Sequence, residues 1–297
     1  MSERTVVRAM PDATGVTHRQ VQVRGIGLHV AEFGRGGDPV VMLHGFPQHW
    51  YAWRDVAARL APDHRLICVD QRGFGWSDAP PTGYTTGDRV ADLLGLLDAL
   101  GLDRVRLVGH EWGAWTGFAA CLRAPERFSH FLALNVVHPW PAHRHLAPSS
   151  WRFWYTTALE APGLGRRVQQ HWPAYTRFLL RRGLGDDPAC LTDDVIEEYV
   201  AATRVPGTAR AGEALHRQFA VRDVPALLTG RDRRRRLTVP TVLLGGENDP
   251  VFPAAVLGGG ERHADDLRVH IVPGAGHWLP EERPGQIAAA ARALFGR

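Results

Sequence analysis

The stretch that decides the fold is VRLVGHEWGAWTGF, residues 105–118. It begins with a mainly apolar run that predicts a buried strand, and it ends with the pattern of a helix. Gly109 and Gly113 bound a sharp turn between the two, because glycine permits a close approach of backbone segments. Glu111 lies at the apex of this turn. A side chain there projects from the N-terminus of a helix, where the helix dipole favours an anion.

Short apolar runs and helical patterns alternate on both sides of this turn. The run DPVVMLHG is apolar, as in a strand buried on both faces, and HRLICVD predicts the next strand. TTGDRVADLLGLLDALGL has the spacing of an amphipathic helix, and TVPTVLLGG and LRVHIVPG predict strands nearer the C-terminus. This alternation indicates βαβ units, and therefore an α/β class with a mostly parallel sheet flanked by helices.

The alternation stops near Pro139. Residues 138–221 are helix-like and rich in Trp, Tyr and Arg, and the strand pattern returns at residue 238. A helical insertion between two halves of one sheet is the simplest explanation. We therefore predict a core made of residues 1–137 and 222–297, with a helical cap made of residues 138–221.

Composition indicates an ordinary globular protein. The 297 residues are 44% hydrophobic and 22% charged, which allows a sizeable buried core. The net charge is +4, and every basic side chain apart from histidine is arginine. The densest basic run, residues 231–236, has no interleaved aromatic residues, so we interpret it as a solvated loop and expect no nucleic-acid partner.

The chain has neither an apolar signal segment at its N-terminus nor a stretch as long as a transmembrane helix. We therefore expect a cytoplasmic location without a membrane partner. Cys68, Cys121 and Cys190 are far apart and lack metal-ligand spacing, which argues against a disulfide framework or a metal site. Cys68 and Cys121 lie in a strand pattern and a helix pattern, so we expect both in the core. The oligomeric state is left open.

Ligands of open α/β sheets bind at the carboxyl ends of the strands. Three polar residues follow three different predicted strands there, namely Glu111, Asp249 and His277. Their order along the chain, acid, acid and histidine, matches the Ser…Asp/Glu…His order of hydrolases with a nucleophile on a strand–helix turn. Here a carboxylate occupies the position of the serine.

Five segments resemble the α/β-hydrolase superfamily, specifically its branch of epoxide hydrolases and haloalkane dehalogenases. They follow the order and spacing of that family over essentially the whole chain, and they read HGFPQHWYAWR, DQRGFGWSD, GHEWGAW, GENDPVFP and GAGHWLPEERP. The resemblance implies an α/β-hydrolase fold with an eight-stranded, mostly parallel sheet and an inserted helical cap. It also implies a hydrolase that acts on a small molecule without a cofactor or metal.

The resemblance assigns a role to each residue of the acid, acid and histidine set. In this branch a carboxylate attacks carbon to form an ester, and a histidine held by a second acid activates the water that hydrolyses the ester. Glu111 matches the attacking residue, His277 the base and Asp249 the second acid. Glu247 is the nearest rival of Asp249, which better fits the pattern of an acid followed by proline.

The remaining implied residues surround that set. The oxyanion hole would be formed by the backbone N–H groups of Trp112 and Phe46, and Phe46–Pro47 resembles a family motif whose X-Pro bond is usually cis. Substrate contacts are expected from His44, Trp112, Trp154 and Trp278. The cap tryptophans, which also include Trp140, Trp151 and Trp172, suggest an apolar or aromatic ligand, although packing of the cap explains them equally well.

Epoxide hydrolases of this kind use two cap tyrosines to stabilise the alkoxide. Tyr155 matches the first, and packing under the cap is the alternative for it. The second position holds His216, or Leu215 by a slipped alignment, and Tyr199 lies in an amphipathic helix where burial explains it. We therefore expect an incomplete tyrosine pair, with His216 either donating a proton or lying on a helix surface.

Glu111 departs from both families, which carry aspartate at the apex. Its extra methylene displaces the carboxylate by about 1.5 Å, and a displacement of about 1 Å can change a rate about 10²-fold. Three alternatives follow: a glutamyl ester in an adjusted pocket, a base or anchor without covalent attack, or a protein that binds a ligand without turnover. Haloalkane dehalogenation is the alternative enzyme activity, and Trp112 does not discriminate because both families carry Trp there.

Overall fold

The structure, a computed structural model, describes residues 8–141 and 154–296. Within these residues an eight-stranded sheet has the order β1-β2-β4-β3-β5-β6-β7-β8. Strands β3 to β8 pair in parallel, whereas β1 pairs antiparallel with β2, and β2 with β4. The prediction of an eight-stranded, mostly parallel sheet is confirmed. The strands are β1 Val16–Val23, β2 Ile26–Phe33, β3 Pro39–Leu43, β4 Arg65–Val69, β5 Val105–His110, β6 Phe128–Leu134, β7 Thr241–Gly246 and β8 Leu267–Val272.

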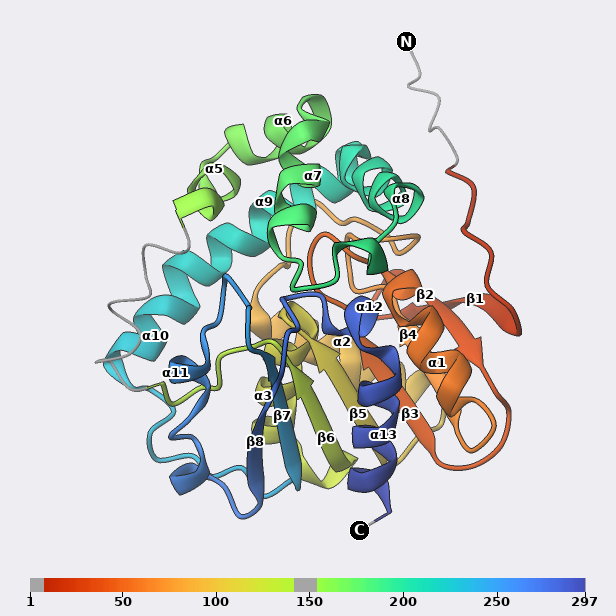
Figure 1. The fold of residues 1–297 in the computed structure, drawn as a ribbon, viewed down its shortest axis with the longest axis vertical. Helices are drawn as coiled ribbons and strands as arrows, with labels where there is room; N and C mark the ends of the chain where they lie inside the picture. The colour runs from red at the N-terminus through yellow and green to blue at the C-terminus, as the bar shows by residue number, and fades with distance from the viewer. Residues whose placement is uncertain (1–7, 142–153, 297) are drawn as a thin grey trace.

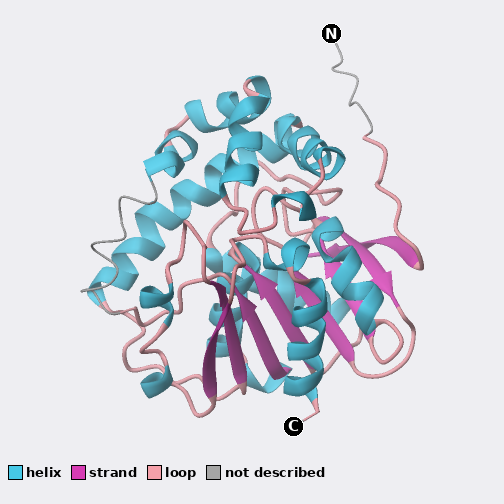
Figure 2. Cartoon of the chain, viewed as in Figure 1, coloured by secondary structure: helices cyan, strands magenta, loops and turns pink. Residues whose placement is uncertain are grey.

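Helices cover both faces of the sheet (Figures 1 and 2). On β3, Val41 and Leu43 pack on the side of α2 and α3, and Val40 and Met42 pack on the side of α1 and α13. This strand is apolar throughout because both of its faces are buried. The flanking helices are α1 Arg54–Leu60, α2 Thr86–Ala99, α3 Trp112–Arg123 and α13 Pro284–Phe295. Cys68 and Cys121 are buried in these two layers, as expected.

A second group of helices lies over the carboxyl ends of the strands (Figure 1). Between β6 and β7 these helices are α5 Thr157–Glu160, α6 Leu164–His171, α7 Pro173–Arg182, α8 Asp193–Arg204, α9 Pro206–Gln218 and α10 Val224–Thr229. The π-helical turn Phe219–Asp223 joins α9 to α10. The expected cap boundary at residue 221 therefore falls inside a continuous helical run, and the division into core and cap stays a prediction.

The described chain also has shorter elements. They include the 3-10 helices Trp50–Trp53, Pro125–Arg127, Pro188–Cys190 and Glu261–His263, with α11 Ala254–Leu257 and α12 Leu279–Glu282. In residues 8–141 and 154–296, no helix combines the length and the apolar character needed to cross a membrane.

The turn between β5 and α3 depends on close backbone contacts. Glu111 has a φ of +50° and a ψ of −113°, a backbone conformation that residues other than glycine rarely adopt. Its N–H donates to the carbonyl of Leu134 at 3.0 Å, and its carbonyl accepts from Trp115 at 2.9 Å. A Cβ on Gly113 would lie 2.0 Å from the carbonyl oxygen of Leu43, so glycine is required there. The neighbouring sheet and helix thus hold the turn in its unusual conformation.

Candidate active site

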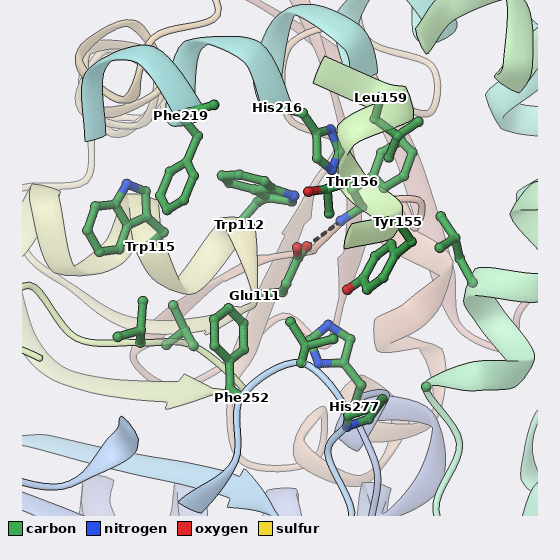
Figure 3. A pocket seen from close by; sticks show the side chains of 18 of the residues that line it. Glu111, Trp112, Trp115, Tyr155, Thr156, Leu159, His216, Phe219, Phe252 and His277 are labelled. Carbon is green, nitrogen blue, oxygen red and sulfur yellow. Dashed lines mark hydrogen bonds between the residues drawn. The ribbon is translucent and has the colours of Figure 1, made fainter. Parts of the chain in front are cut away.

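A cavity of about 450 Å³ lies between the helices over the sheet and the carboxyl ends of the strands. Among the predicted residues, Glu111, His277, Tyr155 and His216 all line it. Its walls are mostly apolar and include Leu179. Their large side chains also include Trp112, Trp115, Leu159, Phe219 and Phe252 (Figure 3). The cavity therefore offers an apolar space with a few polar groups directed into it, as small-molecule sites do.

The carboxylate of Glu111 reaches the predicted oxyanion hole. Its Oε2 accepts the backbone N–H of Phe46 at 2.7 Å, and the backbone N–H of Trp112 also donates to the carboxylate. A Cβ on Gly45 would lie 2.5 Å from Oε2, so the absence of a side chain at Gly45 makes room for the glutamate. The Phe46–Pro47 bond is cis, as the family motif implies.

Two opposing effects set the charge of Glu111. Burial disfavours the ionised form and raises the pKa of the Glu111 carboxyl group to about 7. The His277 charge, the N–H groups of Phe46 and Trp112, and the Arg89 guanidinium act in the opposite direction. Near neutral pH the carboxyl group therefore exists in both forms, and its ionised form can attack carbon.

His277 follows β8 and is held by Asp249, which follows β7. The His277 Nδ1 lies 2.9 Å from Asp249 Oδ2, and Asp249 also accepts from Asn135 Nδ2 at 2.7 Å and from the Val251 N–H at 2.7 Å. Because the Asp249 carboxylate can only accept, Nδ1 of His277 carries the proton of this hydrogen bond. Nε2 then has the lone pair that can take a proton from water. Burial alone would lower the pKa of His277, but the charge and hydrogen bond of Asp249 raise it overall.

The rival acid Glu247 lies elsewhere. Its Oε2 accepts the N–H of Gly274 at 2.9 Å on the exposed side of the loop. Burial alone would raise the pKa of Asp249, but the charge and hydrogen bond of His277 hold it below its usual value, as expected of an ionised partner. The geometry favours Asp249 over Glu247.

Tyr155 presents its hydroxyl group to the cavity, toward Glu111 and His277 (Figure 3). Burial raises the pKa of Tyr155, and the nearby Glu111 charge raises it further, so the phenol keeps its proton at neutral pH. The backbone carbonyl of Tyr155 accepts the hydroxyl of Tyr175, which fixes the segment that carries it. A protonated hydroxyl facing the carboxylate and the base can stabilise an alkoxide.

His216 is buried in α9 and lines the cavity, so it is not a surface histidine. Its Nδ1 lies 2.8 Å from the carbonyl of Gly212. Burial lowers the pKa of His216 to about 4, which keeps the ring neutral. The slipped alternative, Leu215, packs in the apolar cluster around Phe46 and does not line the cavity.

Two predicted substrate contacts lie away from the cavity and are corrected here. His44 is buried at the end of β3, where Nδ1 bonds the Gly45 carbonyl at 2.8 Å and Nε2 accepts the Gln71 N–H at 3.1 Å. Both ring nitrogens of His44 thus bond the backbone of the segments that follow β3 and β4. Trp154 is 58% exposed, and its ring lies 6.2 Å from that of Phe178, which is also exposed, on the outside of the helices over the sheet.

The other predicted tryptophans differ in their positions. Trp278 lines the cavity, and its Nε1 donates to the Leu180 carbonyl at 2.7 Å. Trp140 is buried, and its Nε1 donates to the Asp232 carbonyl at 2.7 Å. Trp172 is 59% exposed, and Trp151 lies outside the described residues.

Sequence reasoning missed two polar residues of the site. Asn135 donates a hydrogen bond to Asp249 and has a φ of +44°. The sequence feature that pointed to it was its position directly after the strand HFLAL, at the carboxyl end of the sheet. Arg89 lies buried in α2, with its guanidinium carbon 5.4 Å from the Trp112 ring centroid. The amphipathic pattern of that helix gave no sign that an arginine faces inward.

Comparisons with known proteins agree with this fold. Residues 38–284 match the family described as alpha/beta hydrolase fold. Epoxide hydrolase 2 from Siraitia grosvenorii is 32% identical over 92% of this chain and 96% of that protein. Epoxide hydrolase A from Mycobacterium tuberculosis is 31% identical over 92% of this chain and 95% of that protein.

A solved structure extends the comparison to three dimensions. Wild-type Cfl2 from Burkholderia cenocepacia has a TM-score of 0.85 and 30% sequence identity, covering 97% of this chain and 98% of that one. The chain therefore belongs to the α/β-hydrolase family, as a hydrolase of its epoxide-hydrolase-like branch.

Proposed function

We propose that the protein opens an epoxide through a covalent glutamyl ester and then hydrolyses that ester. One observation carries the proposal: the Glu111 carboxylate holds one oxygen 2.7 Å from the Phe46 N–H, on the cavity shared with Tyr155 and His277. The extra methylene has thus not removed the carboxylate from the oxyanion hole. This favours a glutamate that acts as nucleophile over an inactive replacement.

The first step forms the ester. The second carboxylate oxygen of ionised Glu111 attacks an epoxide carbon, and the C–O bond of the ring breaks with its electrons passing to the epoxide oxygen. Tyr155 donates its proton to the resulting alkoxide. The oxygen bonded to Phe46 becomes the carbonyl oxygen of the ester, so it is already located where negative charge develops next.

The second step releases a diol. His277 takes a proton from water, whose oxygen attacks the ester carbonyl carbon, and the N–H groups of Phe46 and Trp112 stabilise the oxyanion. The leaving alkoxide receives the proton from His277, and the proton of the restored carboxylic acid returns to Tyr155. One epoxide and one water give one diol, and the enzyme is unchanged.

The cavity indicates the class of substrate. At about 450 Å³ with mostly apolar walls, it suits a small apolar or aromatic epoxide. The Glu111 pKa of about 7 means that the rate of ester formation should rise between pH 6 and 8, as the carboxylate ionises. Tyr155 stays protonated across this range.

Isotope labelling tests the ester. A single turnover of styrene oxide in ¹⁸O water should place the label in the Glu111 carboxylate, and a second turnover in ordinary water should transfer it to the diol. The His277→Gln variant should accumulate the ester, visible as a mass increase on the peptide containing Glu111. His270→Gln, a change at an exposed histidine of β8, is the matched control and should not accumulate it.

The same experiment discriminates the alternatives. Label that enters the diol directly in a single turnover means that Glu111 acts as a base, and the ester mechanism is then wrong. No product and no ester with a panel of epoxides supports a protein that binds without turnover.

A haloalkane dehalogenase is the second candidate. Trp112 lines the cavity, and its indole N–H is buried without a hydrogen-bond partner among the described residues, a role that a bound halide would fill. Halide release from 1-bromohexane tests this activity. Release faster than the hydrolysis of styrene oxide would make dehalogenation the main function.

A further inference from the structure

The imidazole of His216 has a defined proton arrangement. Its Nδ1 lies 2.8 Å from the carbonyl oxygen of Gly212, one helical turn earlier in α9. A carbonyl oxygen only accepts hydrogen bonds, so Nδ1 must carry a proton. A second proton would charge the ring, and burial, together with the Arg89 charge, holds the pKa of His216 at about 4. At neutral pH, Nε2 therefore has a lone pair and no proton.

The His216 ring lies on the wall of the cavity that also holds Glu111 and Tyr155. The His216 ring packs edge-on against Phe46 at 4.8 Å and Trp112 at 5.2 Å between centroids. These are the two residues whose backbone N–H groups bind the Glu111 carboxylate. Figure 3 shows the ring above Glu111 and next to Trp112 and Thr156.

Nε2 has no partner of its own in the described chain, where Nδ1 makes the one hydrogen bond of the His216 side chain. The nearby Thr156 hydroxyl donates to Glu160 Oε1 at 2.7 Å, so its proton is directed elsewhere. A donor from outside the described chain, either a water or a ligand hydroxyl, is therefore what satisfies the lone pair of a ring in an apolar wall.

This arrangement changes what the site can stabilise. Two tyrosines would give the epoxide oxygen two donors, whereas at the two positions that would hold them this cavity presents a donor at Tyr155 and an acceptor at His216. An alkoxide next to His216 Nε2 would face another lone pair, which is repulsive. With this proton arrangement the neutral ring does not serve as a proton donor for ring opening, which disfavours the predicted donor role of His216.

We propose that His216 binds a hydroxyl group on a carbon next to the epoxide, which makes epoxy alcohols the preferred substrates and triols the products. This rests on the proposed epoxide hydrolysis. In such a substrate the epoxide oxygen accepts from Tyr155, and the hydroxyl donates to His216 Nε2. The donor and acceptor of the cavity then match the acceptor and donor of the ligand.

The proton arrangement can be measured without any turnover. Long-range ¹H–¹⁵N correlation spectra of the protein labelled with ¹⁵N-histidine distinguish the two neutral tautomers and the charged ring. The signal that disappears in His216→Gln identifies His216. At pH 7.5 we expect a neutral ring protonated on Nδ1. A ring protonated on Nε2, or a charged ring, would overturn the inference.

Substrate preference tests the assigned class. The probes are 3-phenylglycidol, its O-methyl ether and trans-β-methylstyrene oxide, which differ in whether they offer a donor. We expect kcat/KM for the alcohol to exceed that for each of the others about 10-fold, the usual size of one hydrogen bond. The third probe lacks the extra bulk of the ether, so it separates loss of the donor from a steric effect.

Variants assign the preference to His216. His216→Phe should bring the ratio between the alcohol and the third probe close to one. His216→Gln, whose amide oxygen can accept, should retain part of the preference and is the second variant if the first does not fold. A wild-type protein that turns over all three epoxides equally contradicts this inference alone. No turnover of any probe contradicts the proposed function, and the tautomer measurement remains independent of it.

Discussion

At the scale of single residues, Glu111 combines two conflicting demands. A nucleophile must be ionised, yet the cavity that excludes water from its substrate also disfavours the charge. The N–H groups of Phe46 and Trp112 partly compensate, and the balance leaves the pKa of Glu111 at about 7. Burying the ionised Glu111 carboxylate therefore lowers the stability of the folded protein, although the same carboxylate is the reactive group.

The change Glu111→Gln should therefore stabilise the protein in a pH-dependent way. The folded pKa is about 7 against an ordinary value of 4.5, so between these values the folded state holds a proton that the unfolded state has released. The free energy of unfolding therefore falls as the pH rises from 4.5 to 7. Above pH 7 the full cost of ionising the buried carboxyl group is present. We expect Glu111→Gln to raise the free energy of unfolding by about 3 kcal/mol at pH 8, and by much less at pH 5.

Urea unfolding at the two pH values measures this difference. Glu247→Gln is the matched control, because Glu247 is exposed, and it should change stability little at either pH. An equal gain for Glu111→Gln at pH 5 and pH 8 would show that the carboxyl group is not held neutral in the folded protein.

The length of the side chain leads to a second prediction. Glu111 reaches Phe46 at 2.7 Å, and Glu111→Asp withdraws the carboxylate by about one bond length, 1.5 Å. We expect kcat/KM for styrene oxide to fall about 10²-fold. Steady-state kinetics measure it. Turnover in Glu111→Asp that is absent from the parent would instead mean that the glutamate is an inactivating or specialised replacement.

At the scale of elements, the turn from β5 to α3 positions the nucleophile through backbone packing. A Cβ at Gly113 would lie 2.0 Å from the Leu43 carbonyl oxygen, and neither the helix nor the central strand β3 can move away. Gly113→Ala should destabilise the protein by about 3 kcal/mol or more, as other severe core overpacking does.

A second helical glycine provides the control for this prediction. At Gly87, in α2, a Cβ would meet its nearest neighbour at 3.7 Å. Gly87→Ala should be neutral or stabilising by up to about 1 kcal/mol, because alanine favours helix. Thermal unfolding of both variants measures the difference, and similar melting temperatures would mean that the turn tolerates a side chain.

Elements were predictable from the sequence where one pattern had one explanation. The apolar run of β5 followed by Gly109 and Gly113 requires a strand, a sharp turn and a helix. The direction of His216 stayed open between the site and a helix surface, because the pattern of a helix does not show whether a polar residue faces a cavity or solvent. The sequence pattern also does not locate the boundary between core and cap expected at residue 221, because the helical pattern continues through the π-helical turn into α10.

At the scale of the whole molecule, buried polar contacts join the helices over the sheet to the core. Tyr199 in α8 is fully buried, and its hydroxyl donates to Glu281 in α12. Arg54 at the start of α1 pairs with the same carboxylate at 2.7 Å. Because α12 begins directly after Trp278, which lines the cavity, this contact holds α8 against the segment that directly follows His277.

Tyr199→Phe tests that connection. The change removes the donor but keeps the ring, so a buried carboxylate loses one hydrogen bond and the free energy of unfolding should fall by about 1–3 kcal/mol. Tyr51→Phe is the matched control, because Tyr51 is half-buried and stacks on Arg54 through its ring at 4.4 Å. Urea unfolding compares the two. If both variants lose the same small amount, Arg54 alone satisfies Glu281, and the attachment of the helices to the core rests on apolar packing around Tyr199.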